Sequence, residues 1–200
     1  MKTTSTDGLI RFEFDEAMLK VIEDALGDMK SESRKVLKNA VNATAKQAKT
    51  QLAEKARKTY VVKKTKFTKA MSTKNATAAK PTATIEITGE QMELKDFKVS
   101  PATYKPQNRP SVTKAKVLLS SALKGLDRGS IKAFIVKFQS GHVSVAQRKS
   151  KARYPIKKLL SNSIPKMVGN QEKVFGVVEP DIYDNLMKNI QTEIGKVLKT

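Results

Sequence analysis

The sequence predicts an α+β fold in which a central, mostly antiparallel sheet lies between a long N-terminal helix and a C-terminal amphipathic helix. Near both ends of the chain, apolar residues recur at the three- and four-residue spacing of a helix, whereas in the middle they alternate with polar residues as in strands. The chain has 200 residues, of which 39% are hydrophobic, and this is enough for one domain with a buried core. We therefore expect a single domain over residues 1–200.

Two helices are predicted before residue 60. Asp15 is expected to cap a first helix that ends near residues 27–31, and Ser31 or Ser33 a longer one that reaches about Lys58. Half of the apolar stripe of the longer helix is alanine, so a neighbouring element can approach it closely. The stripe consists of Leu37, Val41, Ala45, Ala48, Leu52 and Ala56.

The middle of the chain mixes strand and loop signals. We expect a short strand at 60–64, a mobile basic loop at about 63–80, and a hairpin over 83–97 that turns at Gly89 and Glu90. Three prolines between Pro101 and Pro110 predict a projecting loop at 101–111, which we expect to be mobile in isolation like the basic loop. Residues 112–120, 131–140 and 142–148 are strand candidates, although 116–126 could equally form a helix.

Two helices are predicted towards the C-terminus. Pro165 can occupy the first turn of a short helix that begins near Ile164. Asp181, directly after Pro180, is expected to cap the terminal helix. The apolar residues of this helix are Tyr183, Leu186, Met187, Ile190, Ile194, Val197 and Leu198.

The net charge of +20 is concentrated in two blocks. Residues 33–80 have fourteen basic and one acidic side chain, and residues 98–166 have sixteen and one, while the other segments are mildly acidic. Such a surplus repels itself unless a polyanion or an acidic partner surface neutralises it. Because no signal-peptide apolar region and no uncharged apolar run of ~20 residues is present, we expect no membrane association.

Residues for catalysis are sparse. The only histidine is His142, and there is no cysteine, so thiolate metal sites and cysteine nucleophiles are excluded. A general base at His142 acting on Ser140 or Ser144 is one interpretation, and a turn histidine bonded to the backbone is the favoured one. No phosphate-binding glycine loop or metal motif occurs. We therefore predict no enzyme activity, no cofactor and no metal.

The basic segments are the stronger candidate site. Their side chains can neutralise phosphates or dock on acidic protein surfaces, although a solvated lysine face has the same composition. Nothing near them predicts a base-reading helix or an aromatic stacking platform. The candidate DNA-channel or docking contacts are Lys63, Lys64, Lys66, Lys69, Arg148, Lys149, Lys151, Arg153, Lys157 and Lys158.

Four segments in order resemble the minor tail protein Z family, the tail completion proteins of long-tailed phages. An alanine-rich helix leads into YVVKK at 60–64, and ATIEITGEQMELKDFKVSP follows at 83–101. AFIVKFQSGHVSVAQR at 133–148 and PIKKLLSNSIPKM at 155–167 precede the terminal helix. The resemblance covers the chain from about residue 34 to the end.

This resemblance implies a structural virion protein that completes the head-proximal end of the tail and supports head–tail joining. It also implies a homo-oligomeric ring, expected to be hexameric, around the DNA channel in the tail or neck, assembled in the host cytoplasm. The implied partners are a tail terminator or tail tube protein, head connector proteins and, non-specifically, genomic DNA. From charge alone, the alternative is a free-standing basic nucleic-acid-binding protein.

Overall fold

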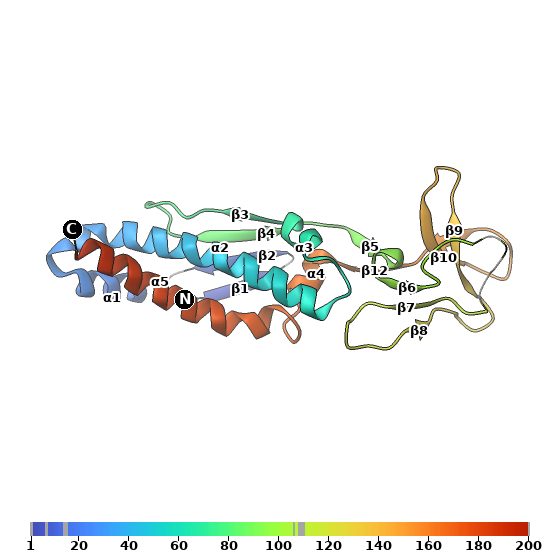
Figure 1. Cartoon of the computed structure of the whole chain (residues 1–200). Helices are drawn as coiled ribbons and strands as arrows, with labels where there is room; N and C mark the ends of the chain where they lie inside the picture. Colours follow the sequence, from blue (N-terminus) through green and yellow to red (C-terminus); the bar gives the residue numbers. More distant parts are fainter. Residues whose placement is uncertain (1, 7, 14–15, 106, 108–110, 200) are drawn as a thin grey trace. The chain divides into compact units, whose positions relative to one another are not determined.

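The computed structural model describes residues 2–6, 8–13, 16–105, 107 and 111–199, and these form two compact units (Figure 1). Unit 1 comprises residues 1–56, 64–89 and 164–200, and unit 2 comprises residues 57–63 and 90–163. Helices and several small antiparallel sheets confirm the α+β prediction. The single tail-completion-like domain stays a prediction, since two compact units can still unfold together.

Unit 1 contains all the long helices. They are α1 (Glu16–Leu26), the 3₁₀ helix η1 (Gly27–Glu32), α2 (Ser33–Thr59, of which the last three residues belong to unit 2), α3 (Lys64–Ala70), α4 (Ile164–Val168) and α5 (Phe175–Val197). The predicted alanine-rich stripe of α2 is buried throughout, which confirms that face. Asp15, the expected cap of the first helix, lies outside the described residues. No helix in the described ranges is long and apolar enough to cross a membrane.

The sheet of unit 1 has the order β1-β2-β4-β3, and all neighbours are antiparallel. Its strands are β1 (Lys2–Thr6), β2 (Leu9–Glu13), β3 (Met71–Lys74) and β4 (Ala83–Ile87). Ala83, Ile85 and Ile87 of β4 are buried on one face, against which the helices α2 and α5 lie (Figure 1). The sequence patterns did not predict β1 and β2, the two N-terminal strands.

α5 packs beside α2 through polar as well as apolar contacts. Asn189 Nδ2 donates to Thr44 Oγ1 over 2.9 Å, and Asn39 Nδ2 donates to Glu193 Oε2 over 2.9 Å. The buried face of α5 consists of Phe175, Val178, Ile182, Leu186 and Ile190. This face is rotated from the predicted stripe, so Tyr183 and Leu198 are about half exposed.

Unit 2 is built from short strands. One sheet has the order β6 (Lys98–Ser100), β7 (Lys114–Lys116) and β8 (Lys124–Gly125). A second has the order β11 (Ile156–Lys158), β10 (Val143–Arg148) and β9 (Ala133–Lys137). A third pairs β12 (Leu160–Ser163) with β5 (Gln91–Glu93). A 3₁₀ turn, η2 (Leu94–Asp96), follows β5. The strand predictions at 131–140 and 142–148 are confirmed as β9 and β10. The helix considered at 116–126 is wrong, because this segment contains turns and β8.

Three predictions around the two basic segments are wrong. Tyr60 forms a single bridge to Leu118 and no strand runs over 60–64. The expected loop at 63–80 begins instead with the helix α3 and the strand β3, because Phe67 and Met71 are buried and fix this segment. The hairpin at 83–97 does not form, because β2 and β3 occupy both edges of β4 and β5 pairs with β12.

The proline predictions had mixed outcomes. The short helix with Pro165 in its first turn is confirmed as α4. Asp181 does not cap α5, which begins at Phe175 and contains Pro180. Val174 and Phe175 are buried, so packing starts the helix before the proline, and Pro180 lies in the second turn, where it cannot donate a backbone hydrogen bond to the Gly176 carbonyl. Residues 101–105, 107 and 111 have no helix or strand, as the loop prediction requires, and 106 and 108–110 lie outside the described residues.

Candidate docking and polyanion-binding surfaces

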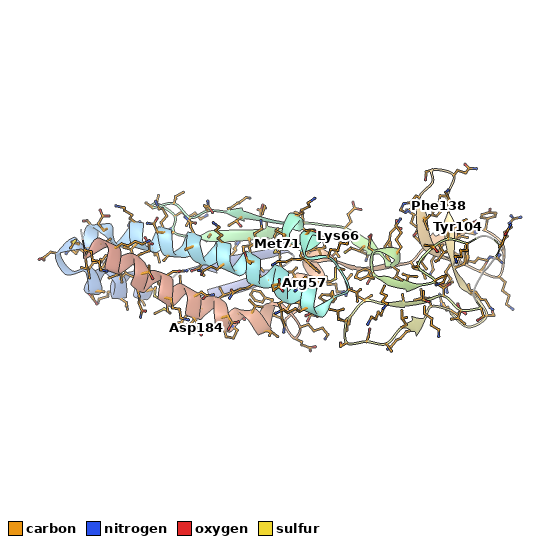
Figure 2. The ribbon with its side chains drawn as sticks, in the orientation of Figure 1. Arg57, Lys66, Met71, Tyr104, Phe138 and Asp184 are labelled. Carbon is orange, nitrogen blue, oxygen red and sulfur yellow. The ribbon has the colours of Figure 1, made fainter. Side chains whose placement is uncertain are left out.

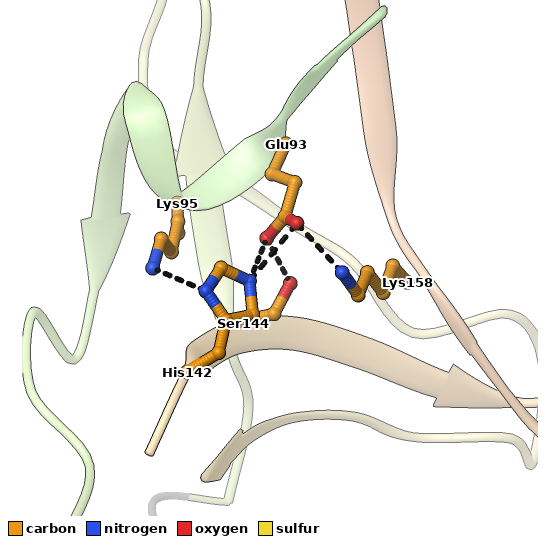
Figure 3. Close-up of polar contacts among 5 residues, drawn as sticks. All are labelled: Glu93, Lys95, His142, Ser144 and Lys158. Atoms are coloured by element: carbon orange, nitrogen blue, oxygen red, sulfur yellow. Dashed lines mark hydrogen bonds and ion pairs between the residues drawn. The ribbon is translucent and has the colours of Figure 1, made fainter. Parts of the chain in front are cut away.

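A cluster of polar side chains around Glu93 connects three strands of unit 2 (Figure 3). Ser144 Oγ donates to Glu93 Oε2 over 2.6 Å, and His142 Nε2 lies 3.0 Å from both carboxylate oxygens. Lys158 Nζ donates to Glu93 Oε1 over 3.0 Å. Glu93 ends β5, Ser144 lies on β10 and Lys158 on β11, so one carboxylate fixes strands from two sheets.

This environment lowers the pKa of Glu93. Burial of the carboxylate by itself favours the neutral form, but hydrogen bonds from Ser144, Lys158 and His142 and the charge of His142 outweigh it and lower the pKa from 4.5 to about 2. Glu93 is therefore ionised throughout the neutral range. Its side chain is only 18% exposed, so these partners replace most of its hydration.

The geometry of the cluster suits a structural role better than a nucleophilic one. In a serine nucleophile the hydroxyl donates to the imidazole, whereas Ser144 donates to the carboxylate. The other ring nitrogen of His142, Nδ1, lies 3.5 Å from Lys95 Nζ. The imidazole also stacks on Phe138, with ring centroids 6.1 Å apart. Within the described residues, no hydrogen bond joins Ser144 to His142.

One expectation about His142 needs correction. Its ring bonds the Glu93 carboxylate and not the backbone, so the favoured turn interpretation named the wrong partner. Asp127, the single acid within residues 98–166, accepts a hydrogen bond from the Ala133 amide over 2.9 Å. Glu93 was missed because it lies 49 residues before His142 in a segment predicted to pair with β4. Among the described residues, no group of three or more potential metal ligands occurs.

The second predicted basic segment forms a hairpin, here called the basic hairpin and defined as residues 148–158. β10 and β11 pair Arg148 with Ile156 and Gln147 with Lys157, and the Lys149 amide donates to the Pro155 carbonyl over 3.0 Å. Arg148, Lys149, Lys151, Arg153 and Lys157 are exposed. Lys158 differs from these residues because its ammonium group is hydrogen-bonded to the Glu93 carboxylate within the chain.

The first predicted basic group is divided between the units. Lys63 belongs to unit 2, whereas Lys64, Lys66 and Lys69 lie on α3 of unit 1. Figure 2 labels Lys66. Lys64 Nζ lies 2.8 Å from Glu54 Oε2 and is partly neutralised. Lys66 and Lys69 are exposed one helical turn apart on the same face.

A further basic surface, the lysine face, was not predicted. It is defined by Lys98, Lys114 and Lys116 on one side of the β6-β7-β8 sheet. Lys98 and Lys116 are directly paired across strands, and Lys114 points to the same side two residues earlier. Like charges opposite one another destabilise an isolated sheet, so this face favours an anionic partner. The alternation KAK at 114–116 was the available signal, but it is only three residues long.

The charge of the molecule follows the division into units. Unit 2 contains nineteen basic and four acidic side chains, net +15, whereas unit 1 contains twenty and fifteen, net +5. Of the four acids, Glu93 accepts hydrogen bonds within its cluster, and Asp127 accepts one from the Ala133 amide. Unit 2, the smaller unit, is thus a scaffold of short strands that carries a strong positive charge.

An α+β scaffold with a cationic unit, and with a polar cluster that connects strands, is typical of a structural or binding protein. Comparison with known protein families supports this class, because the model of the family described as prophage minor tail protein Z (GPZ) matches residues 19–200. The chain belongs to this family, and the predicted resemblance is confirmed. No match is found among the curated proteins or among the solved structures. The chain is therefore a structural protein of the phage tail and a component of the virion, a role that implies no catalysis.

Proposed function

We propose that this chain completes the head-proximal end of the phage tail and supports joining of the tail to the head, as a homo-oligomeric ring around the DNA channel in the neck. It contacts a tail terminator or tail tube protein on one side and head connector proteins on the other. Six copies form the ring, which assembles in the host cytoplasm. No enzyme activity and no cofactor is part of this role.

The net charge of unit 2 is the observation that supports this proposal. A channel through which DNA moves needs contacts that attract phosphates and do not read bases, because base readout would hold the DNA in one register. The lysine face meets this need, since ammonium groups on a sheet contact phosphates regardless of sequence. Lys98 and Lys114 are exposed, and Lys116 Nζ donates to the Leu119 carbonyl over 3.1 Å. We assign Lys63, Lys66 and Lys69 to the same phosphate-contacting class, and Arg148, Lys149, Lys151, Arg153 and Lys157 to protein docking. Lys64 and Lys158 act within the chain through their ion pairs.

The proposal is tested with tails produced in cells that lack this chain. We expect such tails to reach normal length but to fail to form infectious particles with filled heads, and we expect purified chain added afterwards to restore joining. Negative-stain counts of joined particles and plaque titres measure this. Tails without the chain that join heads and infect normally would contradict the proposal.

A free-standing nucleic-acid-binding protein is the second candidate, and the +15 charge of unit 2 favours it as well. It predicts tight duplex binding by purified chain, with a log-log salt slope of about −0.9 for each phosphate contacted. A gel shift without binding at ~50 mM salt would remove it, since non-specific binding is strongest at low salt. Tight binding combined with absence of the chain from purified virions would favour it over the tail role.

A further inference from the structure

A cavity of about 540 Å³ lies in unit 2 beside the basic hairpin. Its lining combines cationic and apolar side chains, and no acid lines it in the described part of the chain. The lining residues that matter here are Ile131, Lys132, Ala133, Phe134, Arg148 and Lys151. Such a cavity fits an acidic segment that also presents an apolar side chain, because charge and shape are then both complementary.

The composition of the lining favours a protein occupant over DNA. Phosphate groups can neutralise Arg148 and Lys151, but a nucleic-acid backbone brings no apolar group to cover Phe134 and Ile131. Nearby in the hairpin, Tyr154 is 66% exposed, and the guanidinium of Arg153 lies 5.7 Å from its ring centroid. Tyrosine and arginine are enriched in protein interfaces. The hairpin and the cavity together thus have the composition of a docking site.

The chain itself contains a matching surface on the first half of α5. From Val174 to Met187 there are three acids and no base, in a protein of net charge +20. Asp181 and Asp184 are exposed three residues apart on the outer side of the helix, where Figure 2 labels Asp184. Val177, one turn before Asp181, is 45% exposed, and Pro180, one turn before Asp184, is exposed as well. This outer face of α5 is acidic and also presents apolar groups.

We propose that the cavity beside the basic hairpin of one copy binds the outer face of α5 of a second copy. This inference rests on the proposed ring and specifies the contact between its subunits. Because the two surfaces are different, the contact is head-to-tail, and repetition of such a contact closes into a ring when the rotation permits. Asp181 and Asp184 pair with Arg148 and Lys151, and the apolar side chains of α5 cover Phe134 and Ile131.

Charge exchange tests this contact. We expect Asp181→Arg with Asp184→Arg, or Arg148→Asp with Lys151→Asp, to weaken self-association by about tenfold or more, because each change places like charges opposite one another. A chain with all four changes regains association, since the pairs are restored with reversed sign. Sedimentation velocity over a range of concentrations measures this. The matched control, Asp24→Arg with Asp28→Arg, makes the same charge change elsewhere in unit 1 and is expected to leave association unchanged.

A disulfide test uses the fact that the chain has no cysteine. Ser150 lines the cavity, and Lys188 is exposed one turn beyond Asp184, so Ser150→Cys in one copy and Lys188→Cys in another report proximity without removing an acid. In an equimolar mixture under mild oxidation, we expect several times more disulfide-linked dimer than from Ser150→Cys mixed with Asp24→Cys. The same mixtures are tested on completed tails, where the local concentration of the chain is highest.

Equal dimer yields in the two mixtures, or no rescue by the fourfold exchange, would overturn the inference. Loss of duplex binding by Arg148→Asp with Lys151→Asp, with association unchanged, would assign the cavity to nucleic acid instead and would also overturn it. These failures differ from failure of the proposed function. If the chain with all four changes does not regain association while wild-type chain still completes tails, the tail role stands and the ring uses another contact.

Discussion

Unit 1 and unit 2 differ in how they are stabilised and in the surface that they present. Unit 1 buries the stripe of α2, one face of β4 and the inner face of α5, so apolar packing holds it, and its charge is nearly balanced. Unit 2 has strands of two to six residues and +15 net charge, and it combines a smaller set of buried apolar residues, such as Leu94, Phe97 and Val145, with hydrogen bonds such as those of Glu93. The comparison favours unit 1 as the main source of stability and unit 2 as the cationic surface on which the proposed function relies.

The largest effect is expected from the core of unit 1. Phe67 is fully buried, and Phe67→Ala should lower the free energy of unfolding by about 3–5 kcal/mol. Thr65→Ala, an exposed neighbour on α3, should change it by less than about 0.5 kcal/mol. Denaturant titration followed by circular dichroism measures both. Equal, small effects would mean that this segment is a loop after all.

The next effect concerns the cluster of unit 2. Glu93→Gln should destabilise unit 2 by about 2 kcal/mol, since it removes charge-assisted hydrogen bonds to Ser144, His142 and Lys158. Hydrogen exchange of the β10 amides measures this loss, and the exposed Glu90→Gln serves as the control. Unchanged exchange in β10 would show that the cluster does not hold the strands together.

The same cluster predicts a dependence on pH. The pKa of Glu93 is about 2 in the folded chain, below the usual 4.5, so its stabilisation is present above pH 4.5 and is lost as the pH falls towards 2. The stability difference between the wild-type chain and Glu93→Gln should therefore shrink over this range. A difference that stays constant from pH 5 to pH 2.5 would contradict the assigned pKa.

A smaller effect is expected on duplex binding. Replacing Lys98, Lys114 and Lys116 with alanine should reduce the magnitude of the salt slope by up to about 0.9 for each phosphate that these lysines no longer neutralise. Replacing the exposed Lys20, Lys30 and Lys46 of unit 1 removes the same charge and should have less effect on the slope. Equal slopes for the two triple variants would mean that net charge alone determines binding.

The smallest effect is expected for His142. Its imidazole makes one of several contacts to Glu93 and stacks on Phe138, so His142→Ala should cost about 1 kcal/mol and leave tail completion intact. Plaque titres at a permissive temperature measure this. Loss of infectivity, in a His142→Ala chain that still folds and assembles, would mean that His142 is again a candidate catalytic residue.

The sequence predicted the long elements and failed on the pairing of short ones, for a physical reason. α2 repeats its apolar spacing over 27 residues, so the pattern of Leu37, Val41 and the alanines determined its face. β5 has three residues, and nothing within them indicates whether β4 or β12 is its partner. Such pairings depend on residues distant in sequence, and the local pattern does not contain them.

The same limit applies to the candidate site. The exposed turn of the basic hairpin was predictable because its basic side chains are adjacent in sequence. The Glu93 cluster was not, because its carboxylate lies 49 residues before His142 and 65 before Lys158. The lysine face also depends on the register that places Lys98 opposite Lys116. Charge density was therefore predictable, and its arrangement on surfaces was not.

The most direct test of the division between a stabilising unit and a binding unit is joining of heads to tails by purified chain. Tails made without the chain are mixed with heads and with wild-type chain, with the lysine-face triple variant, or with the triple variant of unit 1. The account predicts that the lysine-face variant folds normally but yields far fewer joined, DNA-filled particles, while the unit 1 variant matches the wild type. Full joining by the lysine-face variant would contradict the assignment of the cationic unit as the functional surface.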